Sequence, residues 1–234
     1  MVREAHPVRR KAVLDKGFVE IVDCMGSDQR VIDAARVSTG SQAQSDRERD
    51  KQLINFLMEH RHETPFEKIV FEFHVKCPIF VARQWARHRI GSFNERSARY
   101  RVFELDYYVP SLEDMPEGYT AEDIQQYVNC LKGAYEVYER MLAKVADQRE
   151  RRARAREVFR GLLGTAYYTE FFWTVNFRSL MNFLRLRLSE EAQIEMRRYA
   201  QAINEMIPPL IPWSYEAFAT HVLGRAAGRK KRNT

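Results

Sequence analysis

The sequence predicts an α+β fold in which an antiparallel or mixed sheet of few strands packs against six to seven helices. Two or three segments alternate apolar and polar residues with the period of a strand, and six or seven longer ones have the helical period. The two kinds of segment do not alternate regularly, as a doubly wound sheet would require. The chain also lacks a GxGxxG sequence, which excludes a Rossmann nucleotide site. We expect one domain over residues 1–234, with basic tails at about 1–12 and 225–234.

The composition is that of an ordinary globular protein with an excess of positive charge. Hydrophobic residues make up 45% of the chain and charged residues 30%. The net charge of +6 favours anionic partners without choosing among nucleic acid, a membrane surface and phosphorylated small molecules. The three cysteines lie far apart and form no CxxC pair, which favours reduced thiols and no metal site. Because the sequence has neither a signal peptide nor a long apolar run, we expect a cytoplasmic protein.

The first half of the chain is predicted to start with a strand over 17–23 and helices over 28–37 and 46–60. The face of the second helix that we expect to be buried consists of Leu53, Phe56, Leu57 and His60. The clearest strand signal is "KIVFEFHVKC" over 68–77, where every second residue is apolar. Pro78 suits the first turn of a helix that should end at Gly91, ahead of a loop or irregular return strand.

The second half is predicted to be mainly helical. Thr120 and Asp123 resemble a capping box, ahead of a long amphipathic helix over 120–148. A basic helix over 149–160 follows. Three further helices are expected over 178–188, 190–206 and 214–223.

One segment, "RQWARHRIGSFNERSARYR" over 83–101, holds six arginines and a single acid, Glu95. On a helix, Arg83 and Arg87 share one face, as do Gln84 and His88. The arginines could form a solvated basic face packed on Trp85, or they could bind an anion. The second interpretation is favoured because the segment follows a buried strand and mixes Ser and Asn with arginine, which suits bidentate recognition of phosphate and carboxylate.

A second cluster, "FFWTVNFRSLMNFLRLR" over 171–187, places polar residues within a strongly apolar segment. Arg185 fits the exposed face of an amphipathic helix. Asn176, Asn182 and Arg187 fit that interpretation less well, since polar groups held against apolar surface need partners.

These segments carry a resemblance to a known family. "RHRIGSFNERS" over 87–97 consists of RHR, seven further residues and Ser, and it resembles the signature of the flavin-dependent thymidylate synthases. "HETPFEKIVFEFHVKCPIFVARQWARHR" before it, the cluster over 171–187 and "AQIE" over 192–195 are similar to the same family. The resemblance extends from about residue 14 to about residue 218.

The resemblance implies that the protein makes dTMP from dUMP. Methylenetetrahydrofolate would supply the carbon, and FAD would relay hydride from NADPH. The resemblance further implies a homotetramer with active sites shared between chains, and neither nucleic acid nor membrane as a partner. The arginines would then face a nucleotide phosphate, with a charge of about −1.5 to −2 at pH 7, and a flavin pyrophosphate.

The resemblance assigns the site position by position. The residues that resemble dUMP ligands are Gln84, Arg87, Glu95, Arg96, Ser97, Arg99, Arg160 and Arg187. The residues that resemble FAD ligands are Ser38, Thr64, Arg87, His88, Arg89, Glu95, Asn176, Arg178 and Asn182. The family often has Leu-Pro shortly after the arginine that matches Arg160, where this chain has "GLLG".

Arg187 is the predicted catalytic residue. It resembles the arginine beside the uracil ring, where a fixed cation stabilises the negative charge that develops on the N3–C4–O4 edge. Ser97 could instead be a nucleophile, but its activation would need His88 as a base, so we interpret Ser97 as a ligand.

A rival interpretation from another class is a nucleic-acid-binding module. The basic runs "RERRARAR" and "GRKKR" support it. A backbone-binding surface would more typically be an exposed stripe of Lys and Arg, whereas the densest arginine cluster here is mixed with Ser, Asn and Glu.

Overall fold

The structure is a computed structural model that describes residues 9–39, 46–97 and 105–224. Five antiparallel strands form a sheet in the order β1-β2-β3-β5-β4. The strands are β1 (Arg9–Val13), β2 (Gly17–Met25), β3 (Val70–Pro78), β4 (Ser92–Glu95) and β5 (Tyr168–Asn176). The central β3 pairs with β5 along its whole length. The predicted α+β fold with an antiparallel sheet is therefore confirmed.

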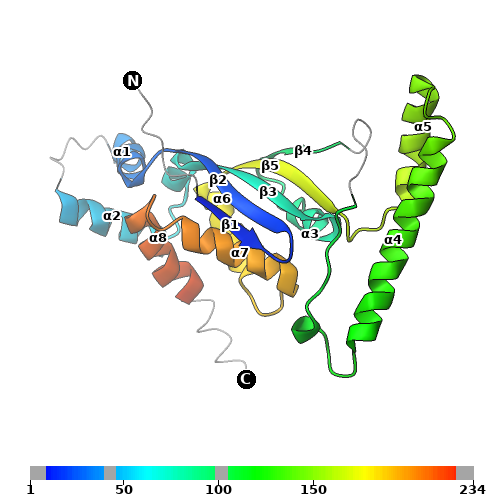
Figure 1. Cartoon of the computed structure of the whole chain (residues 1–234). Coiled ribbons are helices and arrows are strands. Elements are labelled where there is room, and N and C mark those ends of the chain that lie inside the picture. Colours follow the sequence, from blue (N-terminus) through cyan, green and yellow to red (C-terminus); the bar gives the residue numbers. More distant parts are fainter. Residues whose placement is uncertain (1–8, 40–45, 98–104, 225–234) are drawn as a thin grey trace.

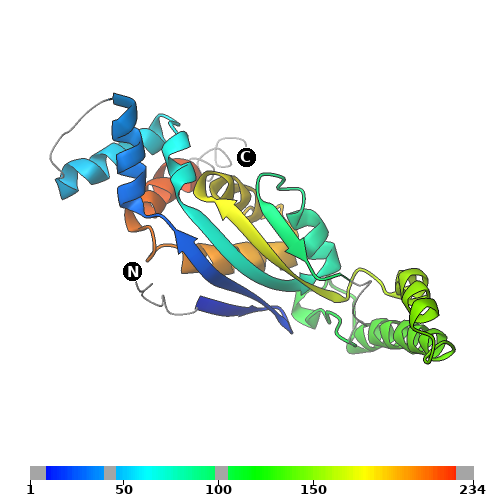
Figure 2. The ribbon, with the colours of Figure 1, turned by 90° about the horizontal axis from the view of Figure 1, so that it is seen from above.

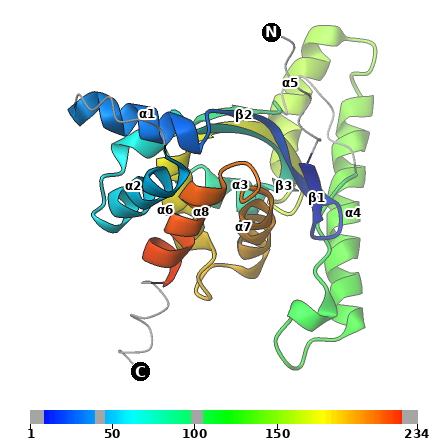
Figure 3. The ribbon, with the colours of Figure 1, turned by 90° about the vertical axis from the view of Figure 1, so that its left-hand side faces the viewer.

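Helices cover one face of this sheet and flank its two ends. The α-helices in the described ranges are α1 (Asp28–Thr39), α2 (Arg47–Glu59), α3 (Ile79–Trp85), α4 (Ala121–Ala143), α5 (Arg149–Phe159), α6 (Phe177–Arg187), α7 (Ile194–Met206) and α8 (Pro212–Phe218). They are joined by three short 3-10 helices, η1 (Thr64–Lys68), η2 (Leu112–Asp114) and η3 (Arg160–Leu162), and by a short π-helix, η4 (Ala219–Leu223). The helices α3, α6 and α7 lie beneath the sheet, which arches over them (Figure 3). The pair α1 and α2 lies at one end and the α4–α5 hairpin at the other (Figures 1 and 2).

The core lies between the sheet and the helices beneath it. On β3, Phe71, Phe73 and Val75 are fully buried. The residues between them, Glu72 and His74, are partly exposed on the open face. The alternation read from "KIVFEFHVKC" is therefore confirmed, and it decides which face of the sheet receives the helices.

Two strands were missed by the sequence analysis. β1 begins at Arg9, inside the stretch predicted as an N-terminal basic tail. This charged segment can form a strand because β1 lies at the edge of the sheet, where charged residues are tolerated. β5 has aromatic residues on both faces, with Trp173 fully buried and Phe172 40% exposed. Its alternation was therefore hidden in a continuous apolar run.

Some predicted helices have different limits or faces. α3 ends at Trp85, so Arg87, His88 and Arg89 follow the helix and do not surround its last turn. On α2, Phe56 is 51% exposed and Met58 is buried, which rotates the predicted buried face. α4 begins with the predicted capping box but ends at Ala143. The described residues contain eight α-helices, one more than the upper expectation.

Two further features concern the cysteines and the apolar segments. Cys24, Cys77 and Cys130 are all free. Among the described helices, none combines the length and apolar character that crossing a membrane requires.

Candidate active site

Arg187, the last residue of α6, meets the turn that follows α3. Its Nε donates to Nε2 of His88 at 3.0 Å, and its Nη2 donates to the backbone carbonyl of Gln84 at 3.3 Å. These residues lie about 100 positions apart in the chain, and α6 and α3 bring them together beneath the sheet. The structure thus joins the predicted catalytic arginine, a predicted dUMP ligand and a predicted flavin ligand.

His88 is held as a neutral imidazole. Burial lowers its pKa from 6.5 to about 4, and the positive charge of Arg187 adds to that effect. Since Nε2 accepts from Arg187, the remaining ring proton is on Nδ1. The ring also lies edge-on to Phe183, with 4.9 Å between ring centroids. Its orientation is therefore fixed by both polar and apolar contacts.

The turn that carries His88 is anchored at both ends. Trp85 is fully buried, and its ring centroid lies 5.4 Å from that of Trp173 and 5.0 Å from that of Phe183. At the other end, a Cβ on Gly91 would lie 2.7 Å from Nε1 of Trp173 and 3.0 Å from the carbonyl oxygen of Thr174. The prediction that the helix ends at Gly91 was wrong, because α3 already ends at Trp85. Gly91 permits the close approach of this segment to β5.

Gln193 is a site neighbour to which the sequence analysis gave no role. It is the N-cap residue of α7, and its Oε1 accepts a hydrogen bond from Nε2 of Gln84. The signal for it was present in the "AQIE" segment, but the spacing of residues does not reveal a contact with Gln84. The contact fixes the direction of a predicted dUMP ligand.

Among the described residues, the arginines around this turn have no acidic partner. Arg83, Arg87 and Arg89 are exposed. Of the carboxylates in the described ranges, none forms an ion pair with these three or with Arg187. Like charges gathered in this way repel one another unless an anion binds between them.

A second group of predicted ligands lies at the opposite end of α6. Arg178 donates to Glu67 at 2.7 Å and to Glu63 at 3.1 Å, which joins α6 to η1, where Thr64 is exposed. Asn176 is the N-cap residue of α6 and accepts from the backbone N–H of Ser179 at 2.9 Å. The Asn176 side chain is thus explained in part by helix capping.

Asn182 lies between the two groups on the exposed face of α6. It is four residues after Arg178, so the two side chains share that face, and it accepts from Arg185 at 3.0 Å. With a rise of about 1.5 Å per residue, Arg178 and Arg187 are roughly 14 Å apart along the helix axis. The predicted flavin ligands of α6 thus form an extended strip.

A third group lies at the end of β4. Oε1 of Glu95 accepts from the Thr169 hydroxyl at 2.7 Å. The backbone N–H of Arg96 donates to the carbonyl of Glu170 at 2.8 Å, and its guanidinium lies 4.0 Å from the Glu170 carboxylate. Glu95 and Arg96 therefore stabilise the β4–β5 edge. Ser97 follows them directly and is half-buried.

Two predicted ligand side chains lie outside the described residues, and a third, Arg160, lies apart from Arg187. Arg99 lies outside the described residues, as does the side chain of Ser38 near the end of α1. Arg160 is exposed at the junction of α5 and η3. The α4–α5 hairpin to which it belongs stands apart from α6 (Figure 1).

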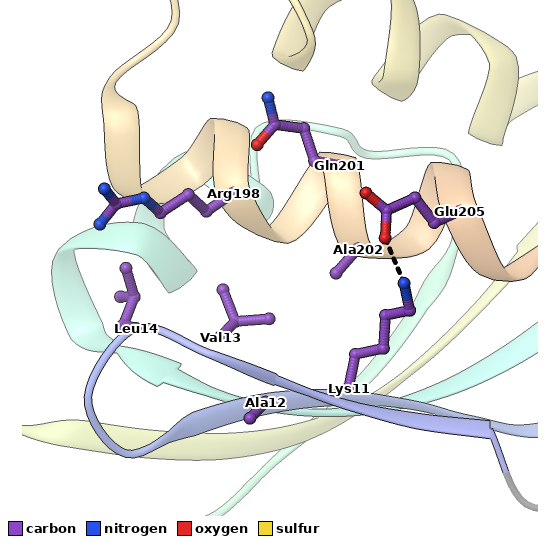
Figure 4. Close-up of a pocket in the computed structure, with 8 residues that line it drawn as sticks. All are labelled: Lys11, Ala12, Val13, Leu14, Arg198, Gln201, Ala202 and Glu205. Carbon is purple, nitrogen blue, oxygen red and sulfur yellow. Dashed lines mark hydrogen bonds and ion pairs between the residues drawn. The ribbon is translucent and has the colours of Figure 1, made fainter.

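A surface pocket of about 390 Å³ lies elsewhere, between β1 and α7 (Figure 4). Its two basic groups already have acidic partners, since Lys11 pairs with Glu205 and Arg198 pairs with Asp114. None of the predicted ligands lines it. We therefore place the candidate active site at the Arg187 cluster and not in this pocket.

Comparisons with known proteins identify the family of this chain. Residues 20–213 match the family model described as "Thymidylate synthase complementing protein". The flavin-dependent thymidylate synthase of Thermosipho melanesiensis is 45% identical over 219 residues, which cover 88% of this chain and 92% of the relative. The flavin-dependent thymidylate synthase of Thermotoga neapolitana is 46% identical over 208 residues, with the same coverage.

A solved structure is similar as well. The UMP/dUMP methylase PolB from Streptomyces cacaoi, bound with 5-Br dUMP, is 33% identical with a TM-score of 0.76, covering 91% of this chain and 98% of that one. An α+β fold with this arginine cluster and these relatives defines an enzyme of the thymidylate synthase class. The chain belongs to the family of flavin-dependent thymidylate synthases.

The depressed pKa of His88 should make stability depend on pH. Between about pH 4 and pH 6.5, the unfolded chain binds a proton at His88 that the native chain does not bind. The free energy of unfolding should therefore rise with pH across this window and level off above it. In His88→Gln, part of that rise should be missing. Urea unfolding at fixed protein concentration measures this, and equal slopes in His88→Gln and wild type would contradict the buried neutral imidazole.

Proposed function

We propose that this enzyme converts dUMP to dTMP, with methylenetetrahydrofolate as carbon donor and FAD relaying hydride from NADPH. The observation that carries the proposal is the half-buried Arg187, whose guanidinium is oriented by His88 and Gln84 beside a group of exposed arginines. Membership of the family supports the substrate, as does the 5-Br dUMP bound to the similar methylase PolB.

The residues present fit a flavin nucleotide. Thr64, Arg178 and Asn182 offer exposed polar groups along η1 and α6. Arg178 already pairs with Glu63 and Glu67, so neutralisation of a pyrophosphate falls mainly to Arg87 and Arg89. When bound, FAD would supply the hydride that completes the methyl group. The chain's own contribution is to bind both nucleotides and keep their charges compensated.

Arg187 would act on the uracil ring of dUMP. Carbon–carbon bond formation at C5 needs an electron-rich ring, and hydride addition at C6 would place negative charge on the N3–C4–O4 edge. A guanidinium already held in place stabilises that charge without reorganisation, and one such preorganised donor contributes about 3–4 kcal/mol in known cases. His88 and Gln84 accept only two of the five N–H groups of the Arg187 guanidinium. The others could therefore donate to this edge of the uracil ring.

Covalent catalysis by the protein is less well supported. The Nε2 lone pair of His88 is engaged by Arg187, which supports Ser97 as a ligand over Ser97 as an activated nucleophile. Burial raises the pKa of the Cys77 thiol well above its usual value and that of Cys24 to about 11, so both remain protonated at neutral pH.

We also propose that the enzyme is a cytoplasmic homotetramer that shares its active sites between chains. Arg160 stands on the α4–α5 hairpin, and Glu95 and Arg96 lie at the β4 edge. Contributions from several chains would allow these residues to reach a single nucleotide. The nucleic-acid alternative rests on α5, where Arg151 and Arg154 are exposed. The half-buried position of Arg187 and its contacts with His88 and Gln84 favour a small-molecule site.

The purified enzyme tests the proposed function directly. We expect a yellow protein whose flavin absorbance changes on denaturation, with release of FAD. With dUMP, methylenetetrahydrofolate and NADPH, chromatography should show dTMP forming in step with NADPH oxidation. Colourless protein that binds RNA or DNA instead would support the rival class.

Loss of Arg187 should act mainly on the chemical step. Arg187→Ala should lower kcat by about 10²–10³, and Arg187→Lys should restore it poorly because lysine lacks the planar fork. Loss of a ground-state phosphate contact, which we assign to Arg99, should mainly raise KM for dUMP. Arg154→Ala removes an exposed arginine of α5 and serves as the control, with unchanged kinetics expected. Steady-state kinetics of each variant, at measured flavin content, test this prediction. An Arg187→Ala enzyme with normal kcat and raised KM would contradict the role of Arg187 at the uracil edge.

A further inference from the structure

The partners of Arg187 share one chemical property. Both acceptors that orient its guanidinium, Nε2 of His88 and the carbonyl of Gln84, are uncharged. Buried arginines are more commonly held by carboxylates, which form shorter and stronger bonds. Within the described ranges, no carboxylate makes an ion pair with Arg187.

The difference matters for a residue that must stabilise charge on a substrate. A carboxylate would orient the guanidinium but also cancel most of its field at the uracil edge. A neutral imidazole fixes the direction of Nε–H and leaves the full positive charge of Arg187 for the substrate. An imidazolium would lose the acceptor and would add a like charge beside the guanidinium.

We propose that His88 is a positioning residue for the reaction: its neutral Nε2 orients the guanidinium of Arg187 toward the pyrimidine edge without neutralising it. This inference rests on the proposed function of Arg187. It adds to the flavin contact implied for His88 by family resemblance, because the side chain acts here through another residue and not on the cofactor.

Several contacts support a fixed imidazole. Trp85 and Gly91 anchor the two ends of the turn, and Phe183 lies edge-on to the ring. Phe183 belongs to the same helix as Arg187 and lies four residues before it, so one helical face presents both contacts to His88. Holding the imidazole rigidly transfers that rigidity to a side chain that would otherwise sample many rotamers.

A double-mutant cycle tests the inference. The variants are His88→Ala, Arg187→Ala and the double variant, with kcat measured at saturating added FAD and expressed per bound flavin. His88→Ala should lower kcat by about 10–100-fold with a smaller change in KM for dUMP. In the Arg187→Ala background the same change should cost less than about threefold, because contacting residues that act together are not additive.

Two substitutions separate orientation from charge. His88→Gln keeps a neutral acceptor and should recover part of kcat relative to His88→Ala. His88→Asp offers an ionised acceptor and should not recover it, because it neutralises the guanidinium. His221→Ala is the matched histidine control, and its kcat should equal that of the wild type. The flavin absorbance and the dissociation constant for dUMP are recorded for every variant.

The outcomes are distinguishable. Additive losses of kcat in the cycle, or full recovery by His88→Asp, would overturn the positioning role while leaving Arg187 as the catalytic arginine. Loss of flavin binding in His88→Ala with normal kcat per bound flavin would overturn it in favour of a cofactor contact alone. A normal kcat in Arg187→Ala would overturn both this inference and the proposed role of Arg187.

Discussion

The burial of Trp85 is the constraint on which the candidate site depends. Its indole packs against Phe171 and Trp173 of β5, Phe183 of α6 and Tyr199 of α7, with ring centroids 5.0–5.9 Å apart. Aromatic pairs of this kind contribute about 0.5–1.5 kcal/mol each beyond the burial of their area. This contact fixes the end of α3 against α6, and that is why His88 meets Arg187 although 99 positions separate them.

From this packing follows an unusual electrostatic arrangement. α3 and the turn after it deliver several arginines to one place, while the groups that orient Arg187 are uncharged. A folded protein tolerates such a collection of charge when it faces solvent or an anion. At the other end of α6, Arg178 is compensated by Glu63 and Glu67. Of the arginines at its two ends, Arg178 is therefore neutralised, whereas Arg187 has no carboxylate partner among the described residues.

The sequence predicted the central strand and the long capped helix because their periodicity is strong. The alternation of "KIVFEFHVKC" and the Thr120–Asp123 capping box both correspond to observed elements. β5 was missed since Phe172 and Trp173 are both aromatic while one is exposed and the other buried. α3 was predicted too long because Gly91 was taken as a helix end, although its role is the close approach to Trp173.

The site was predicted only at the level of residue identity. The family resemblance named Gln84, His88 and Arg187, but their mutual contacts depend on how α3 and α6 cross, which no local pattern encodes. The same is true of the contact from Gln84 to Gln193, which joins residues 109 positions apart. Local periodicity predicts faces of elements, whereas hydrogen bonds between distant elements are decided by packing.

The central claim is that Arg187 reaches the pyrimidine while its orientation is kept by His88. A crystal structure of the enzyme with FAD and dUMP tests it most directly. We expect a terminal nitrogen of Arg187 within about 3 Å of the uracil edge, with Nε still bonded to Nε2 of His88. A structure in which Arg187 is paired with a carboxylate, or in which another residue meets the uracil edge, would contradict the account.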